Sequence, residues 1–573
     1  MTDQEKALSE DYIDIMLDGP LPFESVPAEA DYCYQTIDEN LIILHQQSTA
    51  LPFFDINHFA YQVIPNLYGL MENGYSTLGL FDPTPLSKSG IQEMQRYPMS
   101  LTGKGVVIGF VDTGIQFDNT VFRNQDGSSR ILAIWDQTIQ EGTPPQGFLL
   151  GSEYRMEDIN QALLSEHPRQ LLPTYDEHGH GTAIASVAAG SLLGDGLLFQ
   201  GAAPDADIVM VKCKPAKKNI RDYYLIADNA EVYSEVDIIL GVKYLQQLAI
   251  SLRRPVVICL SMGSNMGDHT GSSTLAGYIN RLATQRNLAI IASGGNEGNQ
   301  RHHYYEEFDE QITAIGYSSV EIRVGEGEKG FVVHFWGSLP NTFSLAIQTP
   351  SGETTEFVDF KARATRRFSF IYIETIVEMN YVMIEQNSGE ELCFIKFHSP
   401  IPGVWTIRVK CLDGINRRCF HMWLPLTEFL TTDTYFLQSS PYCTLTEPSM
   451  ARDIITVTAY NDYNDSFYPE SGRGYTRKDE YKPDLAAPGV DIFTILGRRS
   501  GSSIAAAITA GAAAQFLQWC VTNGNNIYVE TRELKSYFIR GADRTQAISY
   551  PSMEWGYGRL NLAGVFRKLA GLE

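Results

Sequence analysis

Basic side chains are scarce in this sequence relative to acidic ones. Its 573 residues include 44 Lys and Arg against 68 Asp and Glu, a formal net charge of −24. A chain of that charge repels nucleic acid and anionic membrane surfaces. The composition therefore predicts no nucleic-acid partner. Its 44% hydrophobic and 20% charged residues are typical of a globular protein.

Long apolar runs are also lacking. The first 19 residues, MTDQEKALSEDYIDIMLDG, have neither the basic start nor the apolar centre of a classical secretion signal. The most apolar stretch, SIAAAITAGAAAQFL at 503–517, is too short and too rich in alanine for a transmembrane helix. The sequence therefore predicts no classical export signal and no membrane span.

Closely spaced cysteine pairs are missing as well. The eight cysteines are scattered, and none forms a CxxC motif. Cys259, in VVICLSM, lies inside an apolar strand and is typical of a buried thiol. A fold that does not depend on disulfides is predicted.

An α/β pattern occupies the first half of the chain, whose total length indicates two or three domains. From about 101 to 317, short apolar segments such as GVVIGFVDTG and NLAIIASGGN alternate with helical segments such as EVDIILGVKYLQQLAI. Strand–helix alternation of this kind predicts a parallel sheet with helices on both faces.

The pattern changes between about 318 and 425. Segments such as RRFSFIYIE and GVWTIRVKCLDG are short alternating strands joined by Gly, Pro, Asn and Ser turns, which is typical of an antiparallel sandwich or jelly roll. The α/β pattern then resumes, so this part is interpreted as an insertion. It could either stiffen the fold or bind a partner.

The first 80 residues form a smaller unit. YCYQTIDENLIILHQQ and HFAYQVIPNLYGLM are expected to be strands. They are too few to bury a large core alone, so we expect the unit to pack on the α/β domain.

Three polar residues lie where an α/β sheet gathers reactive groups, at the ends of strands or at the starts of helices. Asp112 follows GVVIGFV, His180 precedes a helix in DEHGHGTAIASVAAG, and Asn296 follows LAIIASGG. Taken singly, they have structural explanations, as a turn residue, a helix cap and a left-handed turn.

The stretch RRSGSSIAAAITAG adds three serines, Ser500, Ser502 and Ser503. They are either a polar turn before a buried helix or the place of a nucleophile. Combined with Asp112 and His180, Ser503 completes the chain order Asp, His, Ser, which differs from the chymotrypsin and α/β-hydrolase orders.

Six motifs carry a family resemblance. VDTGI, HGHGTAIASVAAG, LSMGSN, SGGNEGN, KPDLAAPGV and SGSSIAAAITAG resemble, in this order, the motifs of the subtilisin-like serine proteases, or subtilases. The resemblance covers most of the α/β domain. The family pattern Gly-Thr-Ser-Met-Ala aligns with 501–505, which makes Ser503 the nucleophile and puts Ser502 in place of the threonine. Ala507 and Ile508 stand where the family usually has Pro and His.

The resemblance implies a role for each candidate. Ser503 attacks, His180 is the general base, and Asp112 orients the imidazole. Asn296 is implied as the oxyanion donor, an interaction for which subtilisin itself is a standard example. No cofactor is expected, and a metal site stays open.

The strand that binds substrate backbone is implied at Ser261, Met262 and Gly263. Glu297 is expected at the rim of the neighbouring pocket, where it could favour a basic or polar substrate residue.

Within the family, the layout resembles the clostridial germination-specific Csp proteases. That implies a small α+β prodomain at 1–80, a catalytic domain at 81–317 and 426–573, and a jelly-roll insertion at 318–425. The prodomain would be cut off by the protein itself within 70–84 and stay bound noncovalently.

The same resemblance suggests an endopeptidase that activates the precursor of a spore cortex-lytic enzyme, in the spore or outside the cell. Without it, the missing signal favours the cytoplasm. The alternatives are a related subtilase with another protein or peptide substrate, a pseudoprotease acting as sensor or scaffold, and an insertion that binds a glycoprotein.

Two histidine-containing stretches are given structural interpretations. His178 resembles a frequent family neighbour of the catalytic histidine. RHHYYEE, at 301–307, has no recognisable ligand spacing, so a solvated loop is favoured over a metal site.

Overall fold

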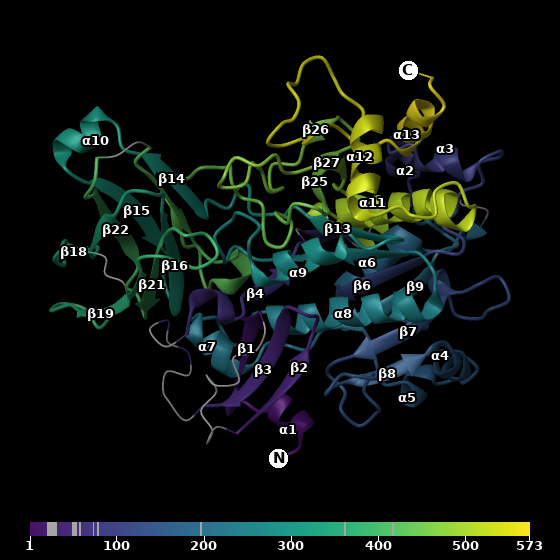
Figure 1. Ribbon diagram of the computed structural model, residues 1–573, viewed down its shortest axis with the longest axis horizontal. Helices are drawn as coiled ribbons and strands as arrows, with labels where there is room; N and C mark the ends of the chain where they lie inside the picture. Colours follow the sequence, from purple (N-terminus) through teal and green to yellow (C-terminus); the bar gives the residue numbers. More distant parts are fainter. Residues whose placement is uncertain are drawn as a thin grey trace.

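A central sheet of nine strands forms the larger part of the molecule in this computed structural model (Figure 1). The structure describes residues 1–19, 31–48, 54, 56, 59–72, 74–76, 80–194, 198–359, 363–414 and 417–572. The order of the strands is β26-β25-β13-β11-β6-β9-β7-β8, with β27 paired to β25. They are β6 (Val107–Asp112), β7 (Ile131–Asp136), β8 (Ser152–Arg155), β9 (Asp207–Lys212), β11 (Val256–Leu260), β13 (Leu288–Ser293), β25 (Ile455–Asn461), β26 (Ser466–Phe467) and β27 (Leu485–Pro488).

The core of this sheet is parallel, as the sequence predicts. Only β8 and β26 pair antiparallel, at its two edges. Every residue of β6 and β11 is buried, because helices cover both faces. Ile108 and Phe110 point into one core, with α6 (His180–Ala189) and α11 (Ser502–Leu517). Val107 and Val111 point into the other, with α8 (Glu235–Leu252) and α9 (Thr274–Leu282).

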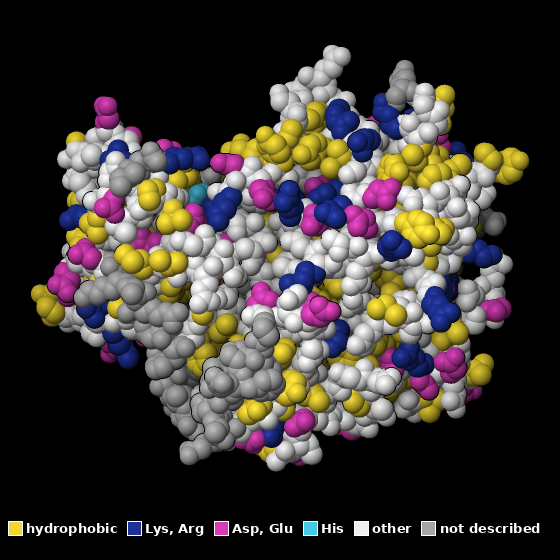
Figure 2. Space-filling view, viewed as in Figure 1, with side chains coloured by type: hydrophobic (Ala, Val, Ile, Leu, Met, Phe, Trp, Pro, Cys, Tyr) yellow, Lys and Arg dark blue, Asp and Glu magenta, His cyan; other side chains and the backbone are white. Residues whose placement is uncertain are grey.

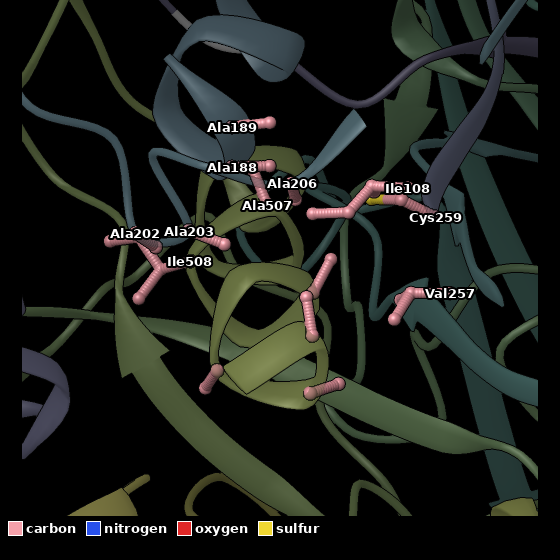
Figure 3. Close-up of a cluster of buried hydrophobic side chains, with 14 of the residues drawn as sticks. Ile108, Ala188, Ala189, Ala202, Ala203, Ala206, Val257, Cys259, Ala507 and Ile508 are labelled. Carbon is pink, nitrogen blue, oxygen red and sulfur yellow. The ribbon is translucent and has the colours of Figure 1, made fainter. Parts of the chain in front are cut away.

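Small side chains let α11 pack closely on its neighbours. Figure 3 shows Ala507 and Ile508 of this helix beside alanines of α6 and of the 202–206 segment. At Gly511 the fit is so close that a Cβ atom would lie 2.3 Å from the Cβ of Ala202. The alanine-rich stretch therefore sets the position of the start of α11, which carries Ser502 and Ser503.

The helix that contains this stretch is longer than the sequence suggests. With the π-helical turn Gln518–Thr522 it runs from Ser502 to Thr522, with a mean hydropathy of 1.4. Within the described part of the chain it alone has the length and apolarity of a membrane span. However, 89% of its apolar window is buried inside the protein, as expected of a core helix.

The N-terminal unit is a three-stranded antiparallel sheet with one helix. α1 (Asp3–Leu8) precedes β1 (Tyr12–Asp18), β2 (Tyr32–Thr36) and β3 (Leu41–Gln47), in the sheet order β1-β3-β2. Met16, Leu41 and Ile43 join the same apolar core as α8, so the unit packs on the α/β domain. The second segment expected to be a strand contains β4 (Leu67–Leu70), which belongs to a different sheet from β1, β2 and β3.

A β-sandwich lies beside the α/β unit, on the left in Figure 1. Its two antiparallel sheets have the orders β14-β23-β16-β21-β20-β19 and β18-β17-β22-β15-β24. Along β15 buried and exposed residues alternate, as expected of a strand with one face on a core. The strands are β14 (His303–Glu307), β15 (Ser318–Val324), β16 (Gly330–Gly337), β17 (Phe343–Gln348), β18 (Val358–Asp359), β19 (Arg363–Ser369), β20 (Ile376–Val382), β21 (Glu391–His398), β22 (Gly403–Cys411), β23 (Cys419–Trp423) and β24 (Tyr435–Phe436).

The sandwich extends beyond 318–425 at both ends. β14 pairs with β23, and β24 pairs with β15. The interpretation of RHHYYEE as a solvated loop is therefore wrong: it contains β14, and His302 and His303 are buried. His303 stacks on Trp423, its partner across the β14–β23 pair, with ring centres 4.6 Å apart.

The cysteines are unpaired. All eight thiols are free, and all but Cys411 are buried. Figure 2 shows acidic and basic side chains interspersed on the face it presents.

The remaining helices are peripheral and short. They are α2 (Thr84–Lys88), α3 (Ile91–Gln95), α4 (Met156–Leu163), α5 (Pro168–Leu171), α7 (Lys218–Tyr223), α10 (Glu310–Ile315), α12 (Thr531–Gly541) and α13 (Leu562–Leu569).

Candidate active site

A buried carboxylate–imidazole pair lies at the carboxyl edge of the central sheet. Asp112 is the last residue of β6 and His180 the first of α6, and neither is exposed. His180 Nδ1 is 2.7 Å from Asp112 Oδ1. Asp176 stabilises the beginning of α6 from the preceding loop, because its carboxylate accepts the N–H groups of Gly179 and Thr182.

The surroundings keep Asp112 charged. Burial alone would raise the pKa of this carboxyl, but the charge of His180 and the hydrogen bonds from His180 and Ser261 bring it below its ordinary value. The Thr113 N–H adds another bond, of 2.7 Å. An ionised Asp112 holds the proton of the imidazole on Nδ1 and leaves Nε2 as the acceptor.

His180 is more basic than an ordinary histidine. Burial lowers the pKa of the ring, but the charge of Asp112 and its hydrogen bond outweigh burial and raise the pKa to about 8. The carboxylate of Glu72 raises it further, and the charge of Arg499 opposes that.

Ser503 is the second residue of α11 and is fully buried. Within the described residues, neither its Oγ nor His180 Nε2 has a hydrogen-bond partner. The two atoms expected to exchange a proton are thus both uncommitted.

Asn296 lies against the start of α11. Its Oδ1 accepts the N–H of Ser502 at 2.9 Å, which turns Nδ2 away, and Nδ2 has no partner among the described residues. Ser502 Oγ in turn accepts the N–H of Gly295 at 3.0 Å. This exchange fixes a free amide donor beside the N-terminus of a helix, where a developing negative charge is favoured.

The chain's own N-terminal segment crosses this site as a strand. β4 pairs antiparallel with β12 (Met262–Gly263) on one side and with β10 (Tyr233–Ser234) on the other. The N–H of Met71 donates to the Ser261 carbonyl at 3.3 Å. The segment expected to bind substrate backbone therefore holds residues 69–71 of the same chain.

Beyond the site the chain is paired again. β5 (Tyr75–Ser76) lies antiparallel to β29 (Gly497–Arg499), which also pairs with β28 (Ile492–Thr494). Between these strand pairs, Met71 and Glu72 lie beside Gly501 and Asn296. Of the window expected to contain the self-cleavage site, 70–84, residues 73 and 77–79 lie outside the described part of the chain.

The Met71 side chain fills a closed pocket. It is 3% exposed, and its sulfur lies 3.8 Å from Thr446 Oγ1. A Cβ on Gly263 would lie 3.0 Å from the same sulfur, so glycine there gives the pocket its depth.

Glu297 is not at the rim of this pocket, contrary to the sequence-based expectation. Its carboxylate is buried, 2.5 Å from His302 Nδ1, and it accepts the Thr427 hydroxyl at 3.1 Å. It therefore has no free charge to offer a substrate.

Several residues at the site escaped the sequence analysis. They are Asp176, which binds N–H groups at the beginning of α6, Thr446, which contacts the Met71 side chain in its pocket, and the ion pair of Glu72 and Arg499. Arg499 stands in the stretch that contains the serines, but no local pattern connects it with a residue 427 positions away. His178 is exposed, with its ring centre 6.5 Å from that of His180.

A buried carboxylate–imidazole pair at the carboxyl edge of a parallel sheet, together with a buried serine and a free amide donor at a helix start, supplies the groups that a serine hydrolase needs. Within the described residues, no three His, Cys, Asp or Glu side chains are grouped so that they could hold a metal ion.

The comparisons with known proteins agree with that class. The pattern of the subtilase family matches residues 103–358 and 440–558, more than half of the chain. The chain therefore belongs to the subtilase family, that of the subtilisin-like serine endopeptidases.

Individual relatives are distant in sequence. The chain is 23% identical to subtilisin-like protease SBT3.1 of Arabidopsis thaliana over 447 residues, 73% of this chain and 52% of that protein. It is 28% identical to serine protease AprX of Bacillus subtilis over 129 residues, 22% of this chain and 21% of that one. The chain thus spans about half the length of the first of these relatives.

A solved structure is similar over nearly its whole length. The CspB protease of Clostridium perfringens superimposes with a TM-score of 0.76 and 27% identity, covering 86% of this chain and 98% of that one. The protein is thus a subtilase that resembles the Csp proteases.

Proposed function

We propose that the protein is an active serine endopeptidase with the catalytic triad Asp112, His180 and Ser503. The observation that carries the proposal is the position of residues 69–72, which lie as an added strand across a site where His180 Nε2 and Ser503 Oγ are both uncommitted. A chain bound in this way has the extended form in which a peptide bond can be cut.

The residues would act in sequence on such a bond. Ser503 Oγ attacks the carbonyl carbon as His180 Nε2 takes its proton, and Asp112 stabilises the imidazolium. Asn296 Nδ2 donates to the oxyanion, supported by the start of α11. His180 then passes the proton to the leaving amine, and water releases the acyl group by the same steps in reverse.

A labelling experiment tests this proposal. A fluorophosphonate reacts only with an activated serine, so we expect one adduct, located by peptide mass spectrometry on Ser503. A protein that is folded but takes up no label would favour the alternative of a pseudoprotease.

The pKa of His180 predicts a pH profile. Only the neutral imidazole accepts a proton, and its pKa near 8 leaves most of it protonated at pH 7. We expect kcat for a peptide of sequence 67–76 to rise about tenfold from pH 7 to 9, because kcat reports the pKa of His180 with substrate in the groove, as Met71 and Glu72 lie in this structure. In a peptide with Gln for Glu72 the rise should move to lower pH, since Glu72 contributes to the high value. A flat profile for both peptides would contradict this assignment.

The N-terminal unit fits the role of a prodomain that the protein cuts off itself. The strand that follows its sheet, β4, already occupies the site, and a bond held in the same molecule is cut at high effective concentration. The free piece would stay bound through its packing on α8.

The natural substrate is proposed from the resemblance to the Csp proteases. On that basis the protein activates the precursor of a spore cortex-lytic enzyme during germination, and the sandwich is a jelly-roll insertion. A related subtilase with a different protein substrate is the alternative.

A further inference from the structure

The peptide bond between Met71 and Glu72 lies at the site. A Cβ placed on Gly501 would be 2.6 Å from the Met71 carbonyl oxygen, 3.0 Å from Asn296 Nδ2 and 3.3 Å from Glu72 Cα. The Met71 carbonyl thus lies beside the free amide donor of Asn296. Gly501, which both approach, is two residues before Ser503. The residue that follows this bond is Glu72.

Among the described residues, one cation pairs with Glu72. Its carboxylate Oε1 pairs with Arg499 Nη1, and the side chains are only 10% and 8% exposed. Arg499 is the last residue of β29, the strand that pairs with the chain beyond the site. The ion pair is therefore formed inside the groove, where water screens it little.

Arg499 also faces the catalytic histidine. Its charge disfavours the imidazolium of His180, whereas the charge of Glu72 favours it. A neutral side chain in place of Glu72 would remove the negative charge that favours the imidazolium and keep the positive charge that disfavours it. An acidic side chain offsets that charge as well as binding to it.

We propose that Arg499 is a specificity-determining residue that selects an acidic side chain directly after the cleaved bond. The protein then cuts its own chain between Met71 and Glu72, and it prefers Glu or Asp at the same position in other substrates. This inference rests on the proposed endopeptidase function.

A charge swap in the chain itself tests the proposal. Self-cleavage is followed by intact-mass spectrometry during cell-free synthesis of the full chain, and the wild type is expected to release a fragment that ends at Met71. Glu72→Arg and Arg499→Glu should each slow the cut about 10- to 100-fold, the range for a lost charged hydrogen bond. The double variant should recover most of the rate.

Arg498→Gln is the matched control. Arg498 is the neighbouring cation on the same strand, but it bonds the carbonyls of Asp491 and Leu80 instead of Glu72. We expect this variant to be cut at the wild-type bond and at close to the wild-type rate. Equal rates for the wild type and Glu72→Arg would overturn the proposal.

A peptide series keeps the test decisive if a swapped variant does not fold. The wild-type protein is given the 67–76 peptide with Glu, Gln or Lys at position 72, and kcat/KM is expected to fall in that order. Equal values for all three would refute the role of Arg499 while leaving the protease assignment intact. No cleavage of any peptide, together with no fluorophosphonate label, would instead refute the proposed function.

Discussion

Ser503→Ala is expected to lower kcat for a peptide by about 10⁶-fold, the loss seen when the serine of a subtilisin triad is removed. On the proposed mechanism its Oγ forms the covalent bond to the substrate, and alanine leaves nothing to attack the carbonyl. Fluorophosphonate labelling should disappear with it. Thermal unfolding should change little, because Oγ has no hydrogen-bond partner among the described residues.

The neighbouring serines provide the controls. Ser502→Ala keeps the backbone N–H that binds Asn296 and loses only the Oγ that accepts the Gly295 N–H, so it should cost far less than Ser503→Ala. Ser500 Oγ only accepts the N–H of Asp491, at 2.9 Å, and its loss should be milder still. Labelling of Ser503→Ala at the wild-type level would show that another residue is the nucleophile.

The second large effect concerns the integrity of the chain. Purified wild-type protein is expected as two pieces, an N-terminal fragment that ends within 70–84 and a core that starts there. Ser503→Ala should run as one intact chain. Intact-mass spectrometry and denaturing electrophoresis of the two proteins decide this directly.

The two pieces should elute together from a sizing column. The fragment is held by apolar packing on α8 and by Asp14, which lies 2.7 Å from Lys217 Nζ in the core and 2.7 Å from His45 Nδ1 in the fragment. Those charges keep the pKa of Asp14 well below its ordinary value despite burial. An uncut wild type that still hydrolyses peptides would disprove autoprocessing and leave the protease assignment standing.

The parallel sheet was predictable because burial on both faces leaves unbroken apolar runs, as in β6 and β11. The alternation in β15 likewise identifies a strand with one buried face. β14 was missed because its residues are His, Tyr and Glu. Their burial comes from contact with β23 and Trp423, which no local pattern encodes.

The same distinction applies to the site. Asp112, His180, Asn296 and Ser503 stand in local motifs, and the structure pairs His180 with Asp112 and Asn296 with Ser502, the neighbour of Ser503. Glu72 and Arg499 meet only because β4 and β29 place them on either side of the groove. Thr446 reaches the Met71 pocket from a loop after the sandwich. Long-range contacts of this kind leave no periodic or compositional trace.

The short strands β10 and β12 have a consequence for what the protein can digest. Each has two residues and finds its partner in β4, which lies between them. Neighbouring strands are about 4.8 Å apart, so the space that β4 fills accepts one extended backbone and is too narrow for a helix, which is about 10 Å across. On the proposed function, compact domains would pass this enzyme unharmed. Its cuts would fall in linkers and tails already pulled out straight, which suits a protease that trims a precursor without destroying the product.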